Sequence, residues 1–224
     1  MKPKQFRIFL ATAFFCILDL FLVATKNDEL RFFSKPFIIP CIAGIYLFSF
    51  ETNKINWKKD MILFGLTASW LGDILLQFDN LFIPGLLSFL IAHVFYILFL
   101  VHTKSENTSF FKLRPVMLLA VLAYLIELMN LLWPHLGPMK IPVLIYGITI
   151  SVMLSSAMWQ YQKLEARTSL FLITGAAFFV ASDSILAINK FKTHFDYSGI
   201  LIMTTYIIAQ LFIVMGAIRY RTAE

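Results

Sequence analysis

The chain has 224 residues, of which 59% are hydrophobic and 14% are charged. This composition excludes an ordinary soluble globular protein and places the chain in a bilayer. The formal net charge is +6, but the basic residues stand in short connections, so membrane orientation explains them better than nucleic-acid binding. Cys16 and Cys41 both lie in apolar segments, as small hydrophobic residues do.

Eight apolar segments come close to the length of about 20 residues that a helix needs to cross a bilayer. They are residues 6–25, 32–50, 61–78, 81–101, 115–133, 141–159, 169–188 and 197–218. Pro40 lies about one turn inside the second segment and predicts a kink there. Because the connections are short, we expect residues 1–224 to form a single all-α domain, an integral membrane bundle of eight transmembrane helices.

Lysine and arginine are distributed unevenly between alternate connections. With the N-terminus inside, the inner segments hold 13 of these residues and the outer segments hold 6. This bias agrees with the positive-inside rule, so we expect both termini on the cytoplasmic side. The short loops and few extensions favour a bacterial inner membrane.

Four of the predicted spans carry a single acidic residue each, and two of these acids, Asp73 and Asp183, match in spacing and depth. A charged side chain at the centre of a membrane helix costs at least about 2.5–3.5 kcal/mol, so such a residue usually faces the bundle interior and has a function. Asp73 lies 13 residues after Asp60, and Asp183 lies 14 residues after Ser169. Both spans run from inside to outside, and at 1.5 Å per residue each acid stands about 20 Å from the inner end. We therefore expect the two acids to face each other across the bundle in its outer half.

The surroundings of the two acids repeat along the chain. A glycine precedes each aspartate by eight residues, and a tyrosine follows each by 23 residues: Gly65 and Gly175, Tyr96 and Tyr206. The pattern indicates a 4+4 internal repeat of two parallel four-helix halves, an organisation found in transporters.

Other polar side chains inside the spans would be unsatisfied in lipid and so predict a polar pocket. Residues three or four positions apart share a helix face, as Ser69 does with Asp73. We predict that the following residues contact a substrate: Ser69, His93, Tyr96, Glu127, Tyr206 and Gln210. Lys35 and Lys190 stand at outer helix ends and are candidates to bind a phosphate head group. Each has a simpler structural explanation, hydrogen bonding between helices for the first six and snorkelling to the interface for the lysines.

Other kinds of catalytic site fit the sequence poorly. Only His93 of the four histidines lies well inside a span, and no zinc-binding spacing of histidine or cysteine occurs, so we expect no metal and no cofactor. A serine nucleophile lacks the G-x-S-x-G motif. The remaining constellation is a pair of carboxyls in an apolar pocket. One of the two would hold a proton while the other stays ionised, which separates a proton donor from an acceptor.

Five segments, in this order, resemble the YhhN family of multi-pass membrane proteins, which includes the lysoplasmalogenases. They are SKP (34–36), SWLGDILL (69–76), GLLSFLIAHVFYI (85–97), SDSILAINKF (182–191) and TYIIAQ (205–210). The resemblance covers the second to the eighth span and gives no information on Asp19 in the first. It implies hydrolysis of the vinyl ether bond of a lysophospholipid, releasing a fatty aldehyde and glycerophosphoethanolamine or glycerophosphocholine. It also places the two aspartates of the family pattern on Asp73 and Asp183.

Paired acids suit this reaction. Protonation of the vinyl ether at its β-carbon forms an oxocarbenium ion, and a second carboxylate stabilises the ion and deprotonates the attacking water. The resulting hemiacetal collapses to aldehyde and alcohol without a cofactor. The sequence does not decide which aspartate donates the proton. Ser182 and Ser184 favour Asp183 as the more hydrogen-bonded, ionised acid.

Three other functions share some of these features. The main alternative is a proton-coupled membrane transporter, which would use the same intramembrane acids and the repeat. An intramembrane aspartyl protease also uses two aspartates, but its Tyr-Asp and Pro-Ala-Leu motifs are absent from this sequence. A non-catalytic lipid-binding protein needs only the pocket. Aldehyde release from a lysoplasmalogen separates the hydrolase from all three.

Overall fold

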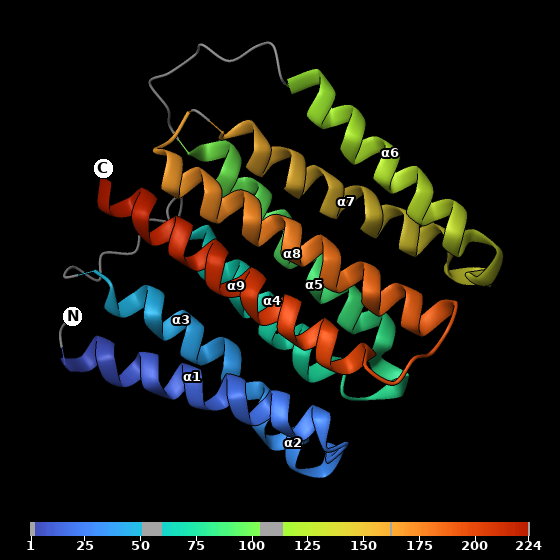
Figure 1. Cartoon of the computed structure of the whole chain (residues 1–224), viewed down its shortest axis with the longest axis horizontal. Coiled ribbons are helices and arrows are strands. Elements are labelled where there is room, and N and C mark those ends of the chain that lie inside the picture. Colours follow the sequence, from blue (N-terminus) through green and yellow to red (C-terminus); the bar gives the residue numbers. More distant parts are fainter. Residues whose placement is uncertain (1–2, 51–59, 104–113, 162, 224) are drawn as a thin grey trace.

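The computed structural model of the chain describes residues 3–50, 60–103, 114–161 and 163–223, and these ranges contain helices and turns but no strand. Figure 1 shows the helices side by side in one bundle, with the start of α1 and the end of α9 at the same end. The α-helices are α1 (Pro3–Ala24), α2 (Asp28–Ser34), α3 (Ile38–Phe48), α4 (Met61–Leu75), α5 (Phe82–His102), α6 (Arg114–Leu132), α7 (Lys140–Trp159), α8 (Ala166–Phe191) and α9 (Ser198–Ala223). Short 3-10 turns are η1 (Lys35–Phe37), η2 (Asp79–Leu81), η3 (Trp133–His135) and η4 (Gly137–Met139).

The helices confirm the prediction of an all-α, polytopic membrane bundle. Within the described ranges, seven helical segments are long and apolar enough to cross a membrane, and α4, with 15 residues, is a shorter apolar helix. Together they coincide with the eight predicted segments. The cytoplasmic position of the termini stays a prediction. Several basic residues that support it lie outside the described residues: Lys2, Lys54, Lys58, Lys59, Lys104 and Lys112.

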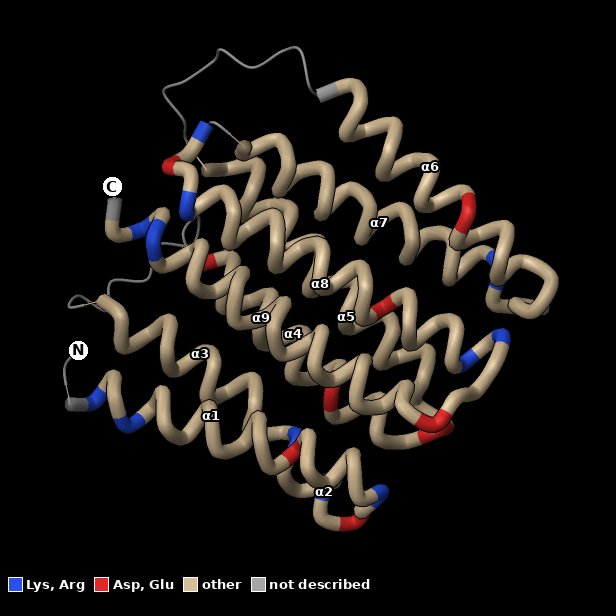
Figure 2. The backbone as a smooth tube through the Cα atoms, in the orientation of Figure 1, with Lys and Arg blue, Asp and Glu red and all other residues tan. Residues whose placement is uncertain are grey.

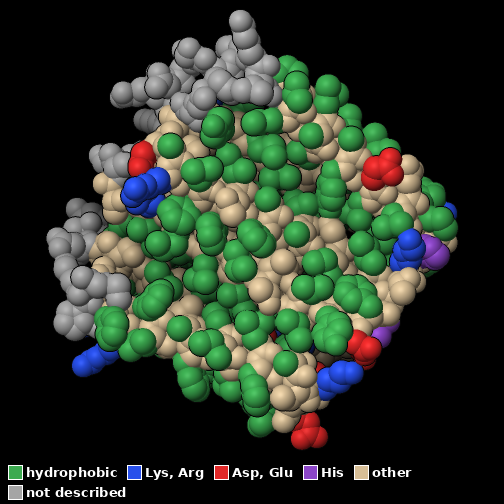
Figure 3. Space-filling model, in the orientation of Figure 1, with side chains coloured by type: hydrophobic (Ala, Val, Ile, Leu, Met, Phe, Trp, Pro, Cys, Tyr) green, Lys and Arg blue, Asp and Glu red, His purple; other side chains and the backbone are tan. Residues whose placement is uncertain are grey.

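The surface of the bundle is that of a protein surrounded by lipid. Charged residues gather near the helix ends (Figure 2), and large apolar side chains cover the face between them (Figure 3). Ile17 and Leu119, for example, are 68% and 63% exposed. A soluble monomer rarely exposes so large an apolar surface, so these side chains fit contact with lipid tails.

Two helix pairs are packed especially closely, α4 against α5 and α8 against α9. A Cβ atom added to Gly175 of α8 would lie 2.8 Å from the backbone nitrogen of Ile213 in α9. One added to Gly65 of α4 would lie 2.3 Å from the ring of Tyr96 in α5. Small residues allow membrane helices this close approach. The contacts bring both aspartate-bearing helices against tyrosine-bearing ones, while the 4+4 repeat itself stays a prediction.

The second predicted span is broken, and the break lies ahead of Pro40 rather than at it. α2 ends at Ser34 and α3 begins at Ile38, after the η1 turn. In a continuous helix the N–H of residue 40 would donate to the carbonyl of Pro36, but proline has no N–H. The indole Nε1–H of Trp70 donates to that carbonyl instead, at 2.8 Å. This bond holds the turn against α4, so that Lys35 stands beside the helix that carries Asp73.

Candidate functional site

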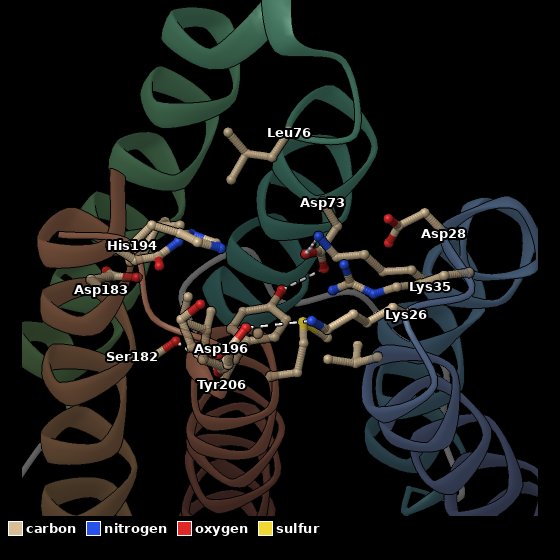
Figure 4. A pocket seen from close by; sticks show the side chains of 18 of the residues that line it. Lys26, Asp28, Lys35, Asp73, Leu76, Ser182, Asp183, His194, Asp196 and Tyr206 are labelled. Atoms are coloured by element: carbon tan, nitrogen blue, oxygen red, sulfur yellow. Dashed lines mark hydrogen bonds and ion pairs between the residues drawn. The ribbon is translucent and has the colours of Figure 1, made fainter. Parts of the chain in front are cut away.

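A cavity of about 430 Å³ opens where the α1–α2 connection meets the α8–α9 connection. Asp73 and Asp183 both line it, together with Lys35 and Tyr206. In Figure 4 the two aspartates stand on separate walls, Asp73 on α4 and Asp183 on α8, and Tyr206 points from α9 toward Asp73. The structure thus brings four of the residues predicted from the sequence into one cavity.

The carboxyl group of Asp73 has a permanent cation beside it. Its Oδ1 lies 3.2 Å from the Nζ of Lys35, and its Oδ2 accepts a hydrogen bond of 2.7 Å from the hydroxyl of Tyr206. Asp73 is only 3% exposed and Lys35 only 8%. A buried carboxylate is tolerated when it is both paired and hydrogen-bonded, and Asp73 meets both conditions.

The carboxyl group of Asp183 has neutral partners. Its Oδ2 accepts a hydrogen bond of 2.7 Å from the hydroxyl of Tyr146 on α7. The Nε2 of His93 lies 3.6 Å from the same oxygen, which is too long for a hydrogen bond. Among the described residues no lysine or arginine forms an ion pair with Asp183. This acid therefore lacks the compensation that Asp73 receives.

The two serines that flank Asp183 donate to backbone carbonyls rather than to its carboxyl group. Ser182 donates to the carbonyl of Ile202 at 3.0 Å, and Ser184 donates to that of Val180 at 2.5 Å. The contacts therefore do not support the expectation that these serines make Asp183 the ionised acid. Each carboxyl accepts from a different tyrosine, and within the described structure no hydrogen bond joins the two.

A cluster of buried rings fixes the side chains around the cavity. Phe179 is fully buried and lies one helical turn before Asp183. The centroid of its ring lies 4.6 Å from that of His93, 5.6 Å from that of Tyr206 and 6.2 Å from that of Tyr96. Such spacings are typical of packed aromatic pairs. The cluster therefore holds Tyr206 in the orientation from which it bonds to Asp73.

Four of the predicted substrate-binding residues lie behind the cavity lining rather than in it. They are Ser69, His93, Tyr96 and Gln210, each at most 1% exposed. The hydroxyl of Tyr96 donates to the Oε1 of Gln210 at 2.8 Å and lies 3.4 Å from the Oγ of Ser69. This network links α4, α5 and α9 one layer away from the two acids. Direct contact of these residues with a substrate stays a prediction.

Glu127 and Lys190 are not brought to the cavity. Glu127 lies on an exposed face of α6, a helix that packs mainly against α7. The ammonium of Lys190 lies 5.0 Å from the centroid of the Phe82 ring, and Lys190 is absent from the lining among the described residues. Their contact with a substrate stays a prediction that the position of neither residue supports.

Sequence reasoning missed several lining or neighbouring residues. Tyr146 bonds to Asp183, and its only signal was a tyrosine in a predicted span that lacks an acid. Lys26 and Arg31 line the cavity, although the sequence suggested for them only a place among the outer basic residues. The spacing of four residues between Arg31 and Lys35 was the available signal, because it places both on one helix face. In the described ranges, no three histidine, cysteine or acidic residues cluster as metal ligands would.

Comparisons with known proteins agree with the segments recognised in the sequence. The model of the YhhN family matches residues 30–217, a range that includes both aspartates of the cavity. Human lysoplasmalogenase TMEM86B is 28% identical over 210 residues, which cover 89% of this chain and 81% of the relative. Human lysoplasmalogenase TMEM86A is 34% identical over 172 residues, which cover 71% and 66%. A lysoplasmalogenase of Mycobacterium tuberculosis is 28% identical over 163 residues, which cover 72% and 60%.

No solved structure matches the chain. The family match nevertheless extends over most of its length and through seven of the eight predicted spans. The chain belongs to the YhhN family.

Proposed function

We propose that this protein is a lysoplasmalogenase, a membrane hydrolase that cleaves the vinyl ether bond of lysoplasmalogens. The products are a fatty aldehyde and glycerophosphoethanolamine or glycerophosphocholine. One observation carries the proposal: a single cavity is lined by two intramembrane aspartates, of which one has a cation beside it and the other has neutral partners. The names of the relatives support the same reaction.

Asp183 is the proton donor in this proposal. Asp183 has no permanent cation beside it in the described part of the chain and its side chain is only 10% exposed, so its neutral acid form is the more stable one. Its O–H bond breaks as the proton passes to the β-carbon of the vinyl ether, and the ether carbon becomes an oxocarbenium ion. Tyr146, which donates to the carboxyl, holds the acid in place and stabilises the carboxylate that forms.

Asp73 is the ionised carboxylate that stabilises the cation and activates the attacking water in this proposal. Lys35 keeps it ionised, and its negative charge stabilises the oxocarbenium ion. It then takes a proton from the attacking water, whose oxygen bonds to the cationic carbon and forms a hemiacetal. The hemiacetal collapses as Asp73 returns this proton to the glycerol oxygen and Asp183 takes the hydroxyl proton. Both acids are then back in their starting states, and one water has been consumed.

The test is aldehyde release by the purified protein in detergent supplied with lysoplasmenylethanolamine. We expect turnover by the wild type and none by Asp73→Asn or Asp183→Asn. The saturated ether analogue, which has no vinyl bond, controls for other lipase activities. Asp79→Asn is the matched control variant, because Asp79 is an exposed acid just after α4 that does not line the cavity. Absence of aldehyde with the folded wild type would refute the proposal, and turnover by either cavity variant would remove that residue from the mechanism.

The main alternative, a proton-coupled transporter, predicts a different outcome. A transporter reconstituted in vesicles would move protons with its cargo and release no aldehyde. A hydrolase releases aldehyde in detergent, where no gradient exists.

A further inference from the structure

A second buried carboxylate stands beside the cavity, in a helix that the family match does not reach. Asp19 of α1 is fully buried, and its Oδ1 lies 3.4 Å from the Nε of Arg31. The family model begins at residue 30, so Asp19 lies outside it. Removing a buried charge from its partner is costly, so Asp19 restricts the position of the Arg31 guanidinium.

Arg31 offers hydrogen-bond donors to the cavity that no described side chain uses. The guanidinium has five N–H donors in a planar fork, and only its Nε edge faces Asp19. Arg31 lines the cavity with a side chain that is 24% exposed, and its Nε, although 3.4 Å from Asp19, has no hydrogen-bond partner among the described residues. A planar fork of this kind matches two oxygens of a phosphate, which a point charge such as lysine does not. Lys35, the neighbouring cation, is already paired with Asp73.

The spacing of Arg31 and Lys35 along the helix suits a glycerophospholipid. Arg31 and Lys35 are four residues apart, so their Cβ atoms are separated by about 5–6 Å. The same order of length separates an ether oxygen from the phosphorus across a three-carbon glycerol unit. A lipid with its ether bond beside Asp73 would therefore carry its phosphate to the guanidinium of Arg31.

Carboxylates join the basic residues at the exposed rim of the cavity. Asp28, Asp196 and Lys26 line the cavity with exposed side chains (Figure 4). The Oδ1 of Asp196 lies 3.4 Å from the Nζ of Lys26, and both side chains are more than two-thirds exposed, so water screens this pair. The less exposed guanidinium of Arg31 is thus followed by an exposed set of two carboxylates and one lysine. A zwitterionic head group has the complementary order, phosphate and then ammonium.

We propose that Arg31, positioned by Asp19, binds the phosphate of a zwitterionic phosphodiester head group, whose ammonium faces Asp28 and Asp196. The proposal rests on the proposed function, because it orients the substrate relative to Asp73 and Asp183. It is tested by binding rather than by turnover, so its failure is distinguishable from failure of the hydrolase assignment.

The experiment measures dissociation constants of the full-length protein in a non-ionic detergent by calorimetry. The main probe is saturated O-hexadecyl glycerophosphoethanolamine, which cannot be hydrolysed at a vinyl bond. O-hexadecylglycerol has the same chain without the phosphate. Glycerophosphoethanolamine and inorganic phosphate have no chain and separate a lipid head group from a free phosphate. The variants are Arg31→Gln, Arg31→Lys and Asp19→Asn.

We expect Arg31→Gln to weaken binding of the phosphate-bearing lipid by about tenfold or more, because a hydrogen bond to a charged group is lost. Binding of O-hexadecylglycerol stays unchanged. Arg31→Lys recovers part of the loss because it restores the charge without the fork. Asp19→Asn weakens binding of the phosphate-bearing lipid when Arg31 is present. It has no further effect on this binding in the Arg31→Gln variant, as expected of a positioning residue.

Arg31→Gln leaves Asp19 without its cation and therefore carries a risk of misfolding. The double variant Asp19→Asn with Arg31→Gln removes both buried charges and provides the second test, with the same expected loss for the phosphate-bearing lipid. The proposal is overturned if folded variants bind this lipid as tightly as the wild type does. It is also overturned if they lose affinity for the two hexadecyl probes to the same extent. Inorganic phosphate binding as tightly as the lipid, with the same dependence on Arg31, would also overturn the assignment to a head group.

Discussion

Asp73 and Asp183 are the same residue type in similarly apolar helices, yet their surroundings differ in one respect. Each accepts a hydrogen bond of 2.7 Å from a tyrosine hydroxyl. Asp73 also has the ammonium of Lys35 at 3.2 Å, whereas the neighbour of Asp183 is the imidazole of His93 at 3.6 Å. The comparison teaches that one residue of the η1 turn, Lys35, gives Asp73 a cation that Asp183 lacks among the described residues, and we propose that this difference separates their proton states.

The largest expected effects come from neutralising each acid. Asp183→Asn and Asp73→Asn should each lower aldehyde release by about 100- to 10,000-fold, the range contributed by general acid–base groups. Only Asp73→Asn should also lower the melting temperature clearly, because it leaves the buried ammonium of Lys35 without a partner. Thermal unfolding in detergent measures this difference. A larger loss of stability in Asp183→Asn would reverse the assignment of the two acids.

Removing the cation should affect the Asp73 site alone. Lys35→Gln should destabilise the protein by about 3–5 kcal/mol, because an uncompensated carboxylate remains buried. Combining it with Asp73→Asn should restore most of the stability and none of the activity. Lys190→Gln is the matched control, since Lys190 is an exposed lysine that does not line the cavity. Equal stability of Lys35→Gln and the control would show that Asp73 does not depend on its cation.

Removing the hydroxyl of each tyrosine should reveal a smaller difference in stability between the two sites. A hydrogen bond to a charged group contributes about 1.5–3 kcal/mol and one between neutral groups about 0.5–1.5 kcal/mol. Tyr206→Phe should therefore cost more stability than Tyr146→Phe, although both remove a bond of the same length. Denaturant or thermal unfolding of the two variants side by side measures the difference. Equal losses, or a larger loss for Tyr146→Phe, would contradict the difference in charge between the acids.

The sequence predicted the helices and the two acids because both leave strong local signals. A run of about 20 apolar residues has few alternatives to a membrane helix, and an acid within it is costly enough to draw attention. Asp73 and Asp183 carried that signal, and the structure places them in one cavity. Contact of Asp73 with Tyr206, by contrast, depends on the packing of α4 and α9, which no spacing in the sequence specifies.

The partners of the acids could not be predicted for the same reason. Lys35 reaches Asp73 because the helix breaks at η1, where Trp70 bonds to the carbonyl of Pro36. The prolines predicted a kink at Pro40, whereas the break lies at η1, and no pattern in the sequence indicated its partner Trp70. Glu127 shows the opposite error. An acid in a span predicts an inward position, yet α6 packs mainly against α7, and Glu127 is exposed.

Infrared spectroscopy of the purified wild type and of each aspartate variant at neutral pH tests most directly which acid holds the proton. A protonated carboxyl has a C=O stretch that a carboxylate lacks. We expect this band to disappear in Asp183→Asn and to persist in Asp73→Asn, because Asp183 holds the proton and Lys35 keeps Asp73 ionised. Loss of the band in Asp73→Asn, with its retention in Asp183→Asn, would contradict the assignment of proton donor and acceptor.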